Sequence, residues 1–297
     1  MFRLPTDCRP GRRHARRLRR LALAAVALAA VAAPAAAEDV AANPDEGVLR
    51  VCASAKDAPH TMGDDSGFEN HIAEVVAAAM GRKVAFVYTD KPAIYLVRDF
   101  LDKNLCDVVM GVDDGDPRVL TTRPYYRTGY VFVSRRDREL EISNWSDEDL
   151  LRVKTIAYQF HSPAEVMLKQ TSLYEDNLIY QTSLINFSDR RNQYKQVPGE
   201  QLISEVIKGS ADVAVAFASD VARYVKASST PLVMTVIDQN GLTASGEVVP
   251  QQYDQSMAVR KDDAALRDAL NAALVKARPE IETILRDEGV PLLPLQS

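Results

Sequence analysis

Short apolar runs and amphipathic segments alternate along most of this chain, and their spacing predicts its secondary structure. Short apolar runs that are bounded by turn residues are typical of strands covered on both faces. They lie at residues 48–54, 84–88, 106–112, 130–133, 155–158, 212–217 and 232–237. Apolar positions at helical spacing predict helices at residues 68–80, 93–103, 162–169, 201–208, 219–227, 263–276 and 279–288. This alternation predicts an α/β fold with parallel strands and right-handed crossovers.

Two of these helices carry further detail. In the helix at residues 93–103 we expect Ile94, Val97 and Leu101 to face inward. The helix at residues 162–169 has Ser162 as its N-cap and Glu165 three residues later, a common way of starting a helix. Residues 173–200 form a mixed stretch to which no single element is assigned.

The segment 107–133 connects the first half of this pattern to the second. Its strand ends in an acidic turn with Asp113, Asp114 and Gly115, and Arg118 follows shortly after. Parallel sheets place ligand sites at the carboxyl ends of their strands, so this turn is expected at a cleft. The chain then continues through PYYRTGYVFV at residues 124–133, the start of a second buried strand.

Two helix–strand units resemble each other. Residues 97–112 and 202–219 both run from an amphipathic helix through a short turn and an aspartate into a buried strand. Two α/β lobes of similar construction would explain this echo, although any two α/β units share the pattern.

The first 37 residues have the three parts of a secretory signal peptide. Eight arginines precede an apolar run at residues 21–33, and a small-residue cleavage site ends at Ala37, before Glu38. The apolar run is shorter than the roughly 20 residues that a transmembrane helix needs. We therefore expect export to the periplasm, cleavage between Ala37 and Glu38, a polar linker at residues 38–47 and no membrane insertion afterwards. A retained membrane anchor is the alternative.

Removal of this leader changes the net charge of the chain. The remaining 260 residues carry 28 basic and 40 acidic side chains, a net charge of −12. Nucleic-acid binding rests on contacts of lysine and arginine with phosphates, so this balance argues against it. It fits a soluble periplasmic protein, and we expect a monomer.

Cys52 and Cys106 are the cysteines that remain after cleavage. Both flank buried strands, and their register places them about three strand residues, or ~10 Å, apart. That separation exceeds the ~7 Å between Cα atoms that a disulfide tolerates. The oxidising periplasm permits a bridge, but the spacing favours two buried free thiols.

The order of several segments resembles type II periplasmic solute-binding proteins. The segments are VLRVCASAKDAP, GFENHIAEVVAAAMGRKVAFVY, CDVVMG, PYYRTGYVFV, ADVAVAF and MAVRKDDAALRDALNAALVKA. The resemblance implies lobe 1 at residues 48–131 and 257–297 and lobe 2 at residues 132–256, with a ligand cleft between them. Two extended crossovers, residues 130–133 and 253–259, would join the lobes and act as a hinge.

A closer resemblance is to one branch of this family, the periplasmic accessory proteins of methanol oxidation. It is carried by residues 90–133, by SLINFSDRRNQY at residues 183–194, and by FASDVARYVKASSTPLVMTVI at residues 217–237 followed by YDQSMAVRKDD at residues 253–263. The resemblance implies methanol dehydrogenase subunits as partners and no transport role. It implies no covalently bound cofactor, although the dehydrogenase cofactor pyrroloquinoline quinone (PQQ) is a candidate for transient contact. The alternatives are an importer component for a small polar or aromatic ligand, and an enzyme that pairs His161 with Asp113.

The cleft departs from the pattern of the amino-acid binders in this family. Ser54 and Phe217 stand where the family has the acids that hold the ligand's ammonium group. Arg118 matches the arginine that clamps a ligand carboxylate, but the surrounding acids make an internal ion pair the alternative. The cleft candidates are Ser54, Asp113, Asp114, Arg118, Tyr125, Gln159, His161 and Phe217.

Three further groups of polar residues are candidate sites. The acids Asp113, Asp114 and Asp116 lack the spacing of an EF-hand, so no metal site is expected. His60 is expected in a loop and His71 on a helix surface. The candidates for a partner surface are Arg190, Arg191 and Tyr194, because arginine and tyrosine are enriched at interfaces; a plain solvated loop is the alternative.

Overall fold

A computed structural model of the chain describes residues 47–171, 173–185 and 196–296. Its principal strands are β1 Val48–Ser54, β4 Lys83–Thr89, β5 Val108–Asp113, β6 Leu120–Thr121, β7 Tyr126–Arg135, β8 Ile156–Tyr158, β9 Val213–Phe217, β10 Leu232–Val236 and β13 Gln252–Val259. Two hairpins stand apart from them, β2 Lys56–Asp57 with β3 Thr61–Met62 and β11 Gly241–Leu242 with β12 Val248–Val249.

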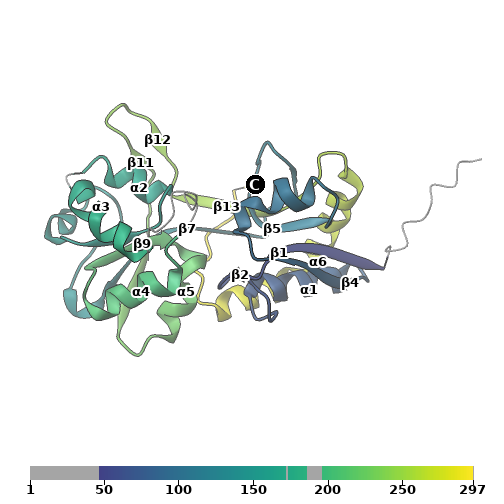
Figure 1. The fold of residues 1–297 in the computed structure, drawn as a ribbon, viewed down its shortest axis with the longest axis horizontal. Helices are drawn as coiled ribbons and strands as arrows, with labels where there is room; N and C mark the ends of the chain where they lie inside the picture. The colour runs from purple at the N-terminus through teal and green to yellow at the C-terminus, as the bar shows by residue number, and fades with distance from the viewer. Residues whose placement is uncertain (1–46, 172, 186–195, 297) are drawn as a thin grey trace, which may run out of the picture. The chain divides into compact units, whose positions relative to one another are not determined.

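Within the described residues the principal strands form one sheet that runs through both lobes. Its order is β4-β1-β5-β13-β7-β9-β8, with β10 beside β7 and β6 beside β13. β1 is parallel to β4 and β5 in lobe 1, and β8 is parallel to β9 in lobe 2. The strands β7 and β13 pass between the lobes and pair antiparallel, with Gln255 opposite Tyr126 (Figure 1).

The helices cover both faces of this sheet. The α-helices are α1 Phe68–Ala79, α2 Pro163–Leu168, α3 Leu173–Leu184, α4 Gly199–Lys208, α5 Ala218–Ala227 and α6 Ala264–Asp287. The shorter turns are the 3₁₀ segments η1 Ala93–Tyr95, η3 Arg136–Arg138 and η4 Glu148–Arg152 and the π-helical segment η2 Val97–Leu101. Among the described residues no helix is both long and apolar enough to cross a bilayer.

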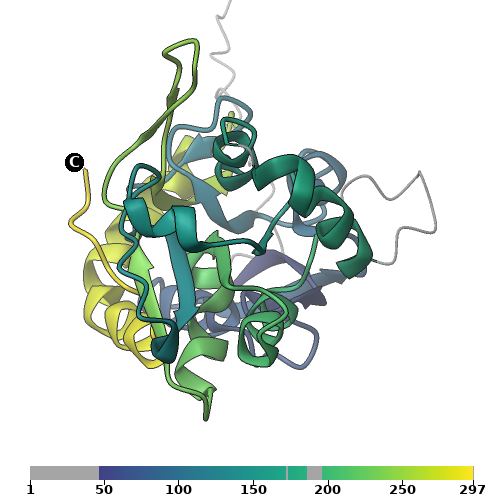
Figure 2. The same ribbon diagram turned by 90° about the vertical axis from the view of Figure 1, so that its left-hand side faces the viewer.

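Alternating strand positions divide each lobe into two hydrophobic clusters. In lobe 1, Val51 and Val108 pack with α1 and α6, whereas Cys52 and Val109 pack with η2 on the other face. Lobe 2 repeats this arrangement, with α4 and α5 on one face of its strands and α2 on the other. Figure 2 turns lobe 2 toward the viewer, and the β11–β12 hairpin projects from its edge.

The echo between the two helix–strand units has a structural counterpart. The Asp107 side chain accepts a hydrogen bond from the N–H of Arg50, and its own N–H donates to the Arg50 carbonyl. Asp212 makes the equivalent contacts beside β8. Its side chain accepts hydrogen bonds from the backbone N–H groups of Lys154 and Thr155, and its own N–H donates to the Thr155 carbonyl. Each aspartate thus ties the start of one strand to the start of its parallel neighbour.

The predicted break at Pro279 was wrong. One helix, α6, runs from Ala264 to Asp287 with Pro279 inside it. The proline removes one backbone donor, but Leu274, Ala277 and Ile281 continue a single buried face on both sides of it. Packing against the core of lobe 1 therefore holds the two segments as one helix.

The regular helix predicted at residues 93–103 is replaced by η1 and η2. Val97 and Leu101 are buried as predicted, but the prediction for Ile94 was wrong, because its side chain is 56% exposed. A 3₁₀ turn followed by a π-turn does not have 3.6 residues per turn. Ile94 therefore rotates away from the face that the α-helical spacing assigned to it.

Helix α3 was missed because its buried positions are polar. Asn177 and Gln181 face the sheet, where their side-chain oxygens accept hydrogen bonds from the N–H groups of Ile156 and Tyr158. These amides take the place of a neighbouring strand at the exposed edge of β8. A pattern built on apolar residues cannot show a helix that packs in this way.

The preference for free thiols was also wrong, since Cys52 and Cys106 form a disulfide with Cα atoms 5.4 Å apart. The prediction treated Cys106 as part of an extended strand, but β5 begins at Val108 and the chain bends at Asp107. The bend brings Cys106 back over the face of β1 that carries Cys52.

Candidate functional site

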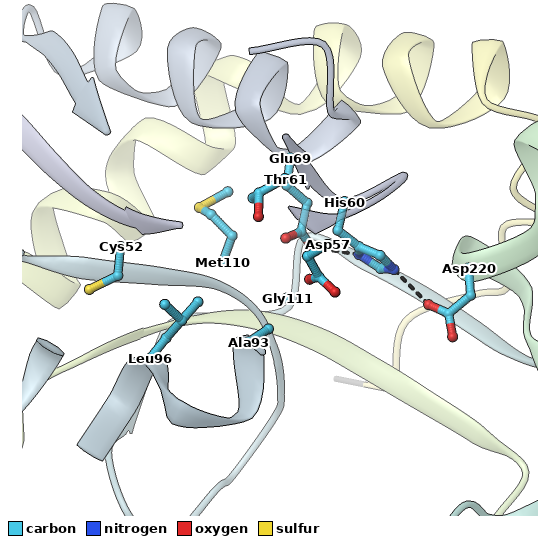
Figure 3. Close-up of a pocket in the computed structure, with 10 residues that line it drawn as sticks. All are labelled: Cys52, Asp57, His60, Thr61, Glu69, Ala93, Leu96, Met110, Gly111 and Asp220. Atoms are coloured by element: carbon cyan, nitrogen blue, oxygen red, sulfur yellow. Dashed lines mark hydrogen bonds and ion pairs between the residues drawn. The ribbon is translucent and has the colours of Figure 1, made fainter. Parts of the chain in front are cut away.

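A cavity of about 150 Å³ lies where the loop after β1 meets α5 of lobe 2. Figure 3 shows its polar side chains converging from both lobes. Its lining consists of Cys52, Asp57, His60, Thr61, Glu69, Ala93, Leu96, Met110, Gly111 and Asp220. Three carboxylates and one imidazole therefore share a small space.

His60 lies at the centre of this group and contacts an acid on each side. Its Nε2 is 2.6 Å from Oδ1 of Asp220 in lobe 2, and its Nδ1 is 3.5 Å from Oε1 of Glu69 in lobe 1. Burial lowers the pKa of His60, but hydrogen bonds and charges from these two acids outweigh burial and raise that pKa well above the ordinary value. Both ring nitrogens therefore face an acid, one in each lobe, and this arrangement favours the charged form of the imidazole.

Glu69 is held in place by a tyrosine and by a glycine. The Tyr125 hydroxyl donates to Oε1 of Glu69 at 3.2 Å and accepts from the N–H of Gly111 at 3.1 Å. Gly111 has φ +60°, and a Cβ at this position would overlap the Glu69 carboxylate. The glycine is thus required both by its backbone conformation and by the closeness of Glu69.

Asp57 points into the same space without a side-chain hydrogen bond among the described residues (Figure 3). Burial raises its pKa to about 6, with the His60 cation acting against the shift and the neighbouring acids adding to it. On the far side of the cluster, the amide of Gln159 donates to Oδ2 of Asp220 at 2.9 Å. A polar network thus runs from Tyr125 in lobe 1 to Gln159 in lobe 2.

Two wider cavities open next to this one. One of about 320 Å³ has Tyr130, Gln159 and His161 in its wall, and one of about 800 Å³ has Ser54, Phe160 and His161. Asp57 belongs to the walls of all three cavities. The predicted candidates Ser54, Gln159 and His161 therefore lie at a cleft between the lobes.

Other predicted cleft residues lie outside these walls. Asp113 accepts a hydrogen bond from Gln255 at 2.7 Å, and Asp114 accepts from Ser256 and Thr121. Arg118 forms an ion pair of 2.6 Å with Asp116, and its side chain is 58% exposed. None of the three cavities includes Asp113, Asp114 or Arg118 in its wall.

The aromatic candidates lie on the crossover strands. Phe217 packs against Tyr130 of β7 and Tyr253 of β13, with ring centroids 5.5 and 6.2 Å apart. Tyr125 and Tyr126 are buried in the core of lobe 1 with their rings edge to face. These aromatic rings stabilise the junction between the lobes.

Sequence reasoning missed the four ionisable residues at the centre. His60 was assigned to an ordinary loop, and the family's acid of lobe 2 was taken as lost because Phe217 stands in its place, whereas the structure provides Asp220 in the first turn of α5. A usable signal was the density of ionisable residues, Asp57, His60 and Glu69, just after the first strand. The partner-surface candidates Arg190, Arg191 and Tyr194 and the cleavage site Ala37–Glu38 lie outside the described residues.

Within the described ranges, no group of three or more His, Cys, Asp and Glu side chains is arranged to hold a metal ion. PQQ carries three carboxylates. The acids Asp57, Glu69 and Asp220 of the 150 Å³ cavity, here called the inner cavity, would repel them. The cavity of about 800 Å³, here called the outer cavity, has Asp57 and Asp90 in its wall together with Ile94 and Phe160.

Comparison with known proteins decides the family. The family of bacterial extracellular solute-binding proteins, family 3, matches residues 49–285. The chain belongs to this family. The predicted type II solute-binding fold, α/β with two lobes, is thereby confirmed.

Three relatives of this family-3 protein are particularly similar. Protein MoxJ of Methylorubrum extorquens is 53% identical over 257 residues, which are 86% of this chain and 85% of that protein. Protein MoxJ of Paracoccus denitrificans is 51% identical over 246 residues, 83% of this chain and 89% of that protein. MxaJ from Methlophaga aminisulfidivorans, of which a crystal structure exists, is 48% identical to this chain. The two structures match with a TM-score of 0.79 over 82% of this chain and 100% of the MxaJ chain. The resemblance to this branch of the family is thus confirmed.

Proposed function

We propose that this chain is a periplasmic accessory protein of methanol oxidation that assists assembly or activation of a PQQ-dependent methanol dehydrogenase and has no transport role. One observation carries the proposal: the two MoxJ proteins share about half of their residues with this chain over more than four fifths of its length. The similarity supports an association with methanol oxidation. Membership of an extracellular family supports the periplasm as the location.

The chemistry of the cleft supports a role other than amino-acid uptake. Arg118, which would clamp a carboxylate, pairs with Asp116 and lies outside the cavities. The inner cavity instead holds His60 between Glu69 and Asp220, so its polar groups are used within the chain. Among the described residues that line the inner cavity, no cation is free of an acid, and such a lining does not favour the carboxylate of an amino acid.

Affinity capture tests the proposed partner. The tagged chain would be expressed in a methanol-grown host that lacks its own copy and captured from the periplasm. We expect co-purification of methanol dehydrogenase subunits in amounts that exceed those from an untagged control. Recovery of importer membrane subunits without any dehydrogenase would instead favour the importer alternative, for which the outer cavity of about 800 Å³ leaves room.

A deletion strain tests the proposed role. We expect lower methanol dehydrogenase activity on deletion, and the amounts of dehydrogenase protein and bound PQQ separate assembly from activation. Complementation with the wild-type chain should restore activity. Normal dehydrogenase amount, cofactor content and activity in the deletion strain would refute the proposal.

A further inference from the structure

Helix α5 of lobe 2 contributes to the cores of both lobes. Ala218 and Val221 pack in the cluster of lobe 2 that includes β9 and α4. Ala222, the next residue around the helix, packs in the lobe 1 cluster with α1 and α6. A helix that is buried on both sides can transmit contacts from one lobe to the other.

Arg223 on this helix makes a two-pronged contact with lobe 1. Its Nε and Nη2 lie 2.6 and 2.8 Å from the two carboxylate oxygens of Glu288, just past the end of α6. Nη2 also donates to the carbonyl of Ser66 at 3.1 Å. The pair is mostly buried, with 28% of the arginine and 15% of the glutamate side chain exposed. Such bidentate pairs are among the stronger and more directional contacts.

Lys226 makes a second contact with the same end of α6. Its ammonium group lies 2.5 Å from the carbonyl oxygen of Asp287 and 3.4 Å from that of Arg286. The last carbonyls of a helix have no partner within it and carry partial negative charge. Gly289, with φ +82°, lets the chain turn away directly beneath Lys226.

A third residue of α5, Asp220, contacts lobe 1 through His60. Asp220, Arg223 and Lys226 are spaced three residues apart, which places them next to one another on the surface of the helix. We call these residues the α5 contact face. All three contact groups of lobe 1 that lie far from the crossover strands in the sequence.

We propose that the α5 contact face holds the two lobes in one fixed closed arrangement through contacts within the chain, so that the lobes act as one rigid body rather than as a ligand-driven hinge. Opening would break a bidentate ion pair, a histidine–aspartate pair and the lysine cap of α6 together. A ligand would then enter through the wide outer cavity instead of by lobe separation.

Measuring the distance between the lobes tests this proposal. Dyes on Leu151→Cys in lobe 2 and Val275→Cys in lobe 1, both highly exposed positions, would report lobe separation by single-molecule energy transfer on the mature chain with its native disulfide. We expect Arg223→Ala to raise the ratio of open to closed molecules roughly tenfold, as for the loss of one charge-assisted hydrogen bond. The double variant Arg223→Glu with Glu288→Arg should restore the wild-type distribution.

Arg267→Ala is the matched control, because Arg267 pairs with Asp268 on the same helix α6 within lobe 1. It should leave the distribution unchanged. Glu288→Gln provides the same test if Arg223→Ala does not fold. A folded variant without the pair that keeps the wild-type distribution would overturn the proposal, as would an equal opening in Arg267→Ala or failure of the charge swap to close the lobes.

Discussion

His60 and Asp220 lie 160 residues apart in the sequence and are joined by a hydrogen bond of 2.6 Å between Nε2 and Oδ1. The histidine belongs to the loop after β1, and the aspartate belongs to α5 of the other lobe. With Glu69 facing its second nitrogen, the partly buried histidine lies between two acids, which raise its pKa. This pair is one of the contacts that join the two lobes.

Asp220→Asn should lower the pKa of His60 and destabilise the fold. The substitution keeps the shape of the side chain but removes the charge that favours the imidazolium. We expect a loss of about 1–3 kcal/mol in the free energy of unfolding, the cost of a hydrogen bond to a charged group. Urea unfolding measures the loss, and NMR titration of the His60 ring measures the pKa. Asp268→Asn, at a 66% exposed side chain, is the control and should change neither quantity.

The same pair should make stability depend on pH. A raised pKa in the folded state gives stability that is fully present below the unfolded value near 6.5 and lost as pH rises through the folded value. The free energy of unfolding of the wild type should therefore fall as pH increases above about 6.5. Asp220→Asn should show a smaller fall in that window. Parallel curves for the two proteins would mean that His60 does not carry the dependence.

Asp57→Asn should stabilise the protein at high pH. The pKa of Asp57 is raised to about 6, so the folded state disfavours its charged form. We expect a gain of about 1–2 kcal/mol at pH 8, after allowing for partial exposure, and little change at pH 4, where the acid is largely protonated in the folded protein. Urea unfolding at both pH values checks this. A loss of stability at pH 8 would show that Asp57 has a favourable partner.

Much of the fold could be predicted because it follows from apolar spacing. The strands around Val51, Val108 and Val215 are buried on both faces, and their sequences contain unbroken apolar runs. The exceptions depend on contacts that no local pattern records. Gln181 lies on the buried face of a helix because it bonds the edge of a strand, and Pro279 remains inside a helix because the core packs on both sides of it.

The site was less predictable because it combines distant segments. Ser54, Gln159 and His161 were named as cleft residues because they match family positions that contact the ligand, and the structure places them in cavity walls. His60 and Asp220 acquire their role only when the lobes meet, and each alone is an ordinary polar residue in a loop or a helix. Their pairing is a property of the tertiary structure, which a single sequence does not display.

Gly111→Ala should displace the Glu69 side chain and weaken its contact with His60. An alanine at φ +60° is strained, and its Cβ would overlap the Glu69 carboxylate. We expect a loss of about 1–3 kcal/mol in the free energy of unfolding from the strain and the overlap, together with a lower pKa for His60. Gly115→Ala is the matched control, since Gly115 has φ +77° with open space around its Cβ position. A pKa change in Gly115→Ala equal to that in Gly111→Ala would rule out the displacement of Glu69 as the cause.

Removing the disulfide should lower the free energy of unfolding by more than any of the substitutions above. The bridge joins Cys52 and Cys106, which are 54 residues apart, and loop-closure entropy for such a span corresponds to about 4 kcal/mol. The double variant Cys52→Ala with Cys106→Ala should therefore unfold at lower urea concentration, and the wild type treated with a reductant should match it. The bridge ties the strand that leads into the His60 loop to the chain just before β5, so NMR titration of His60 should also respond to reduction. Detection of two free thiols in the untreated exported protein would contradict the bridge, and equal stability with and without reductant would contradict its contribution.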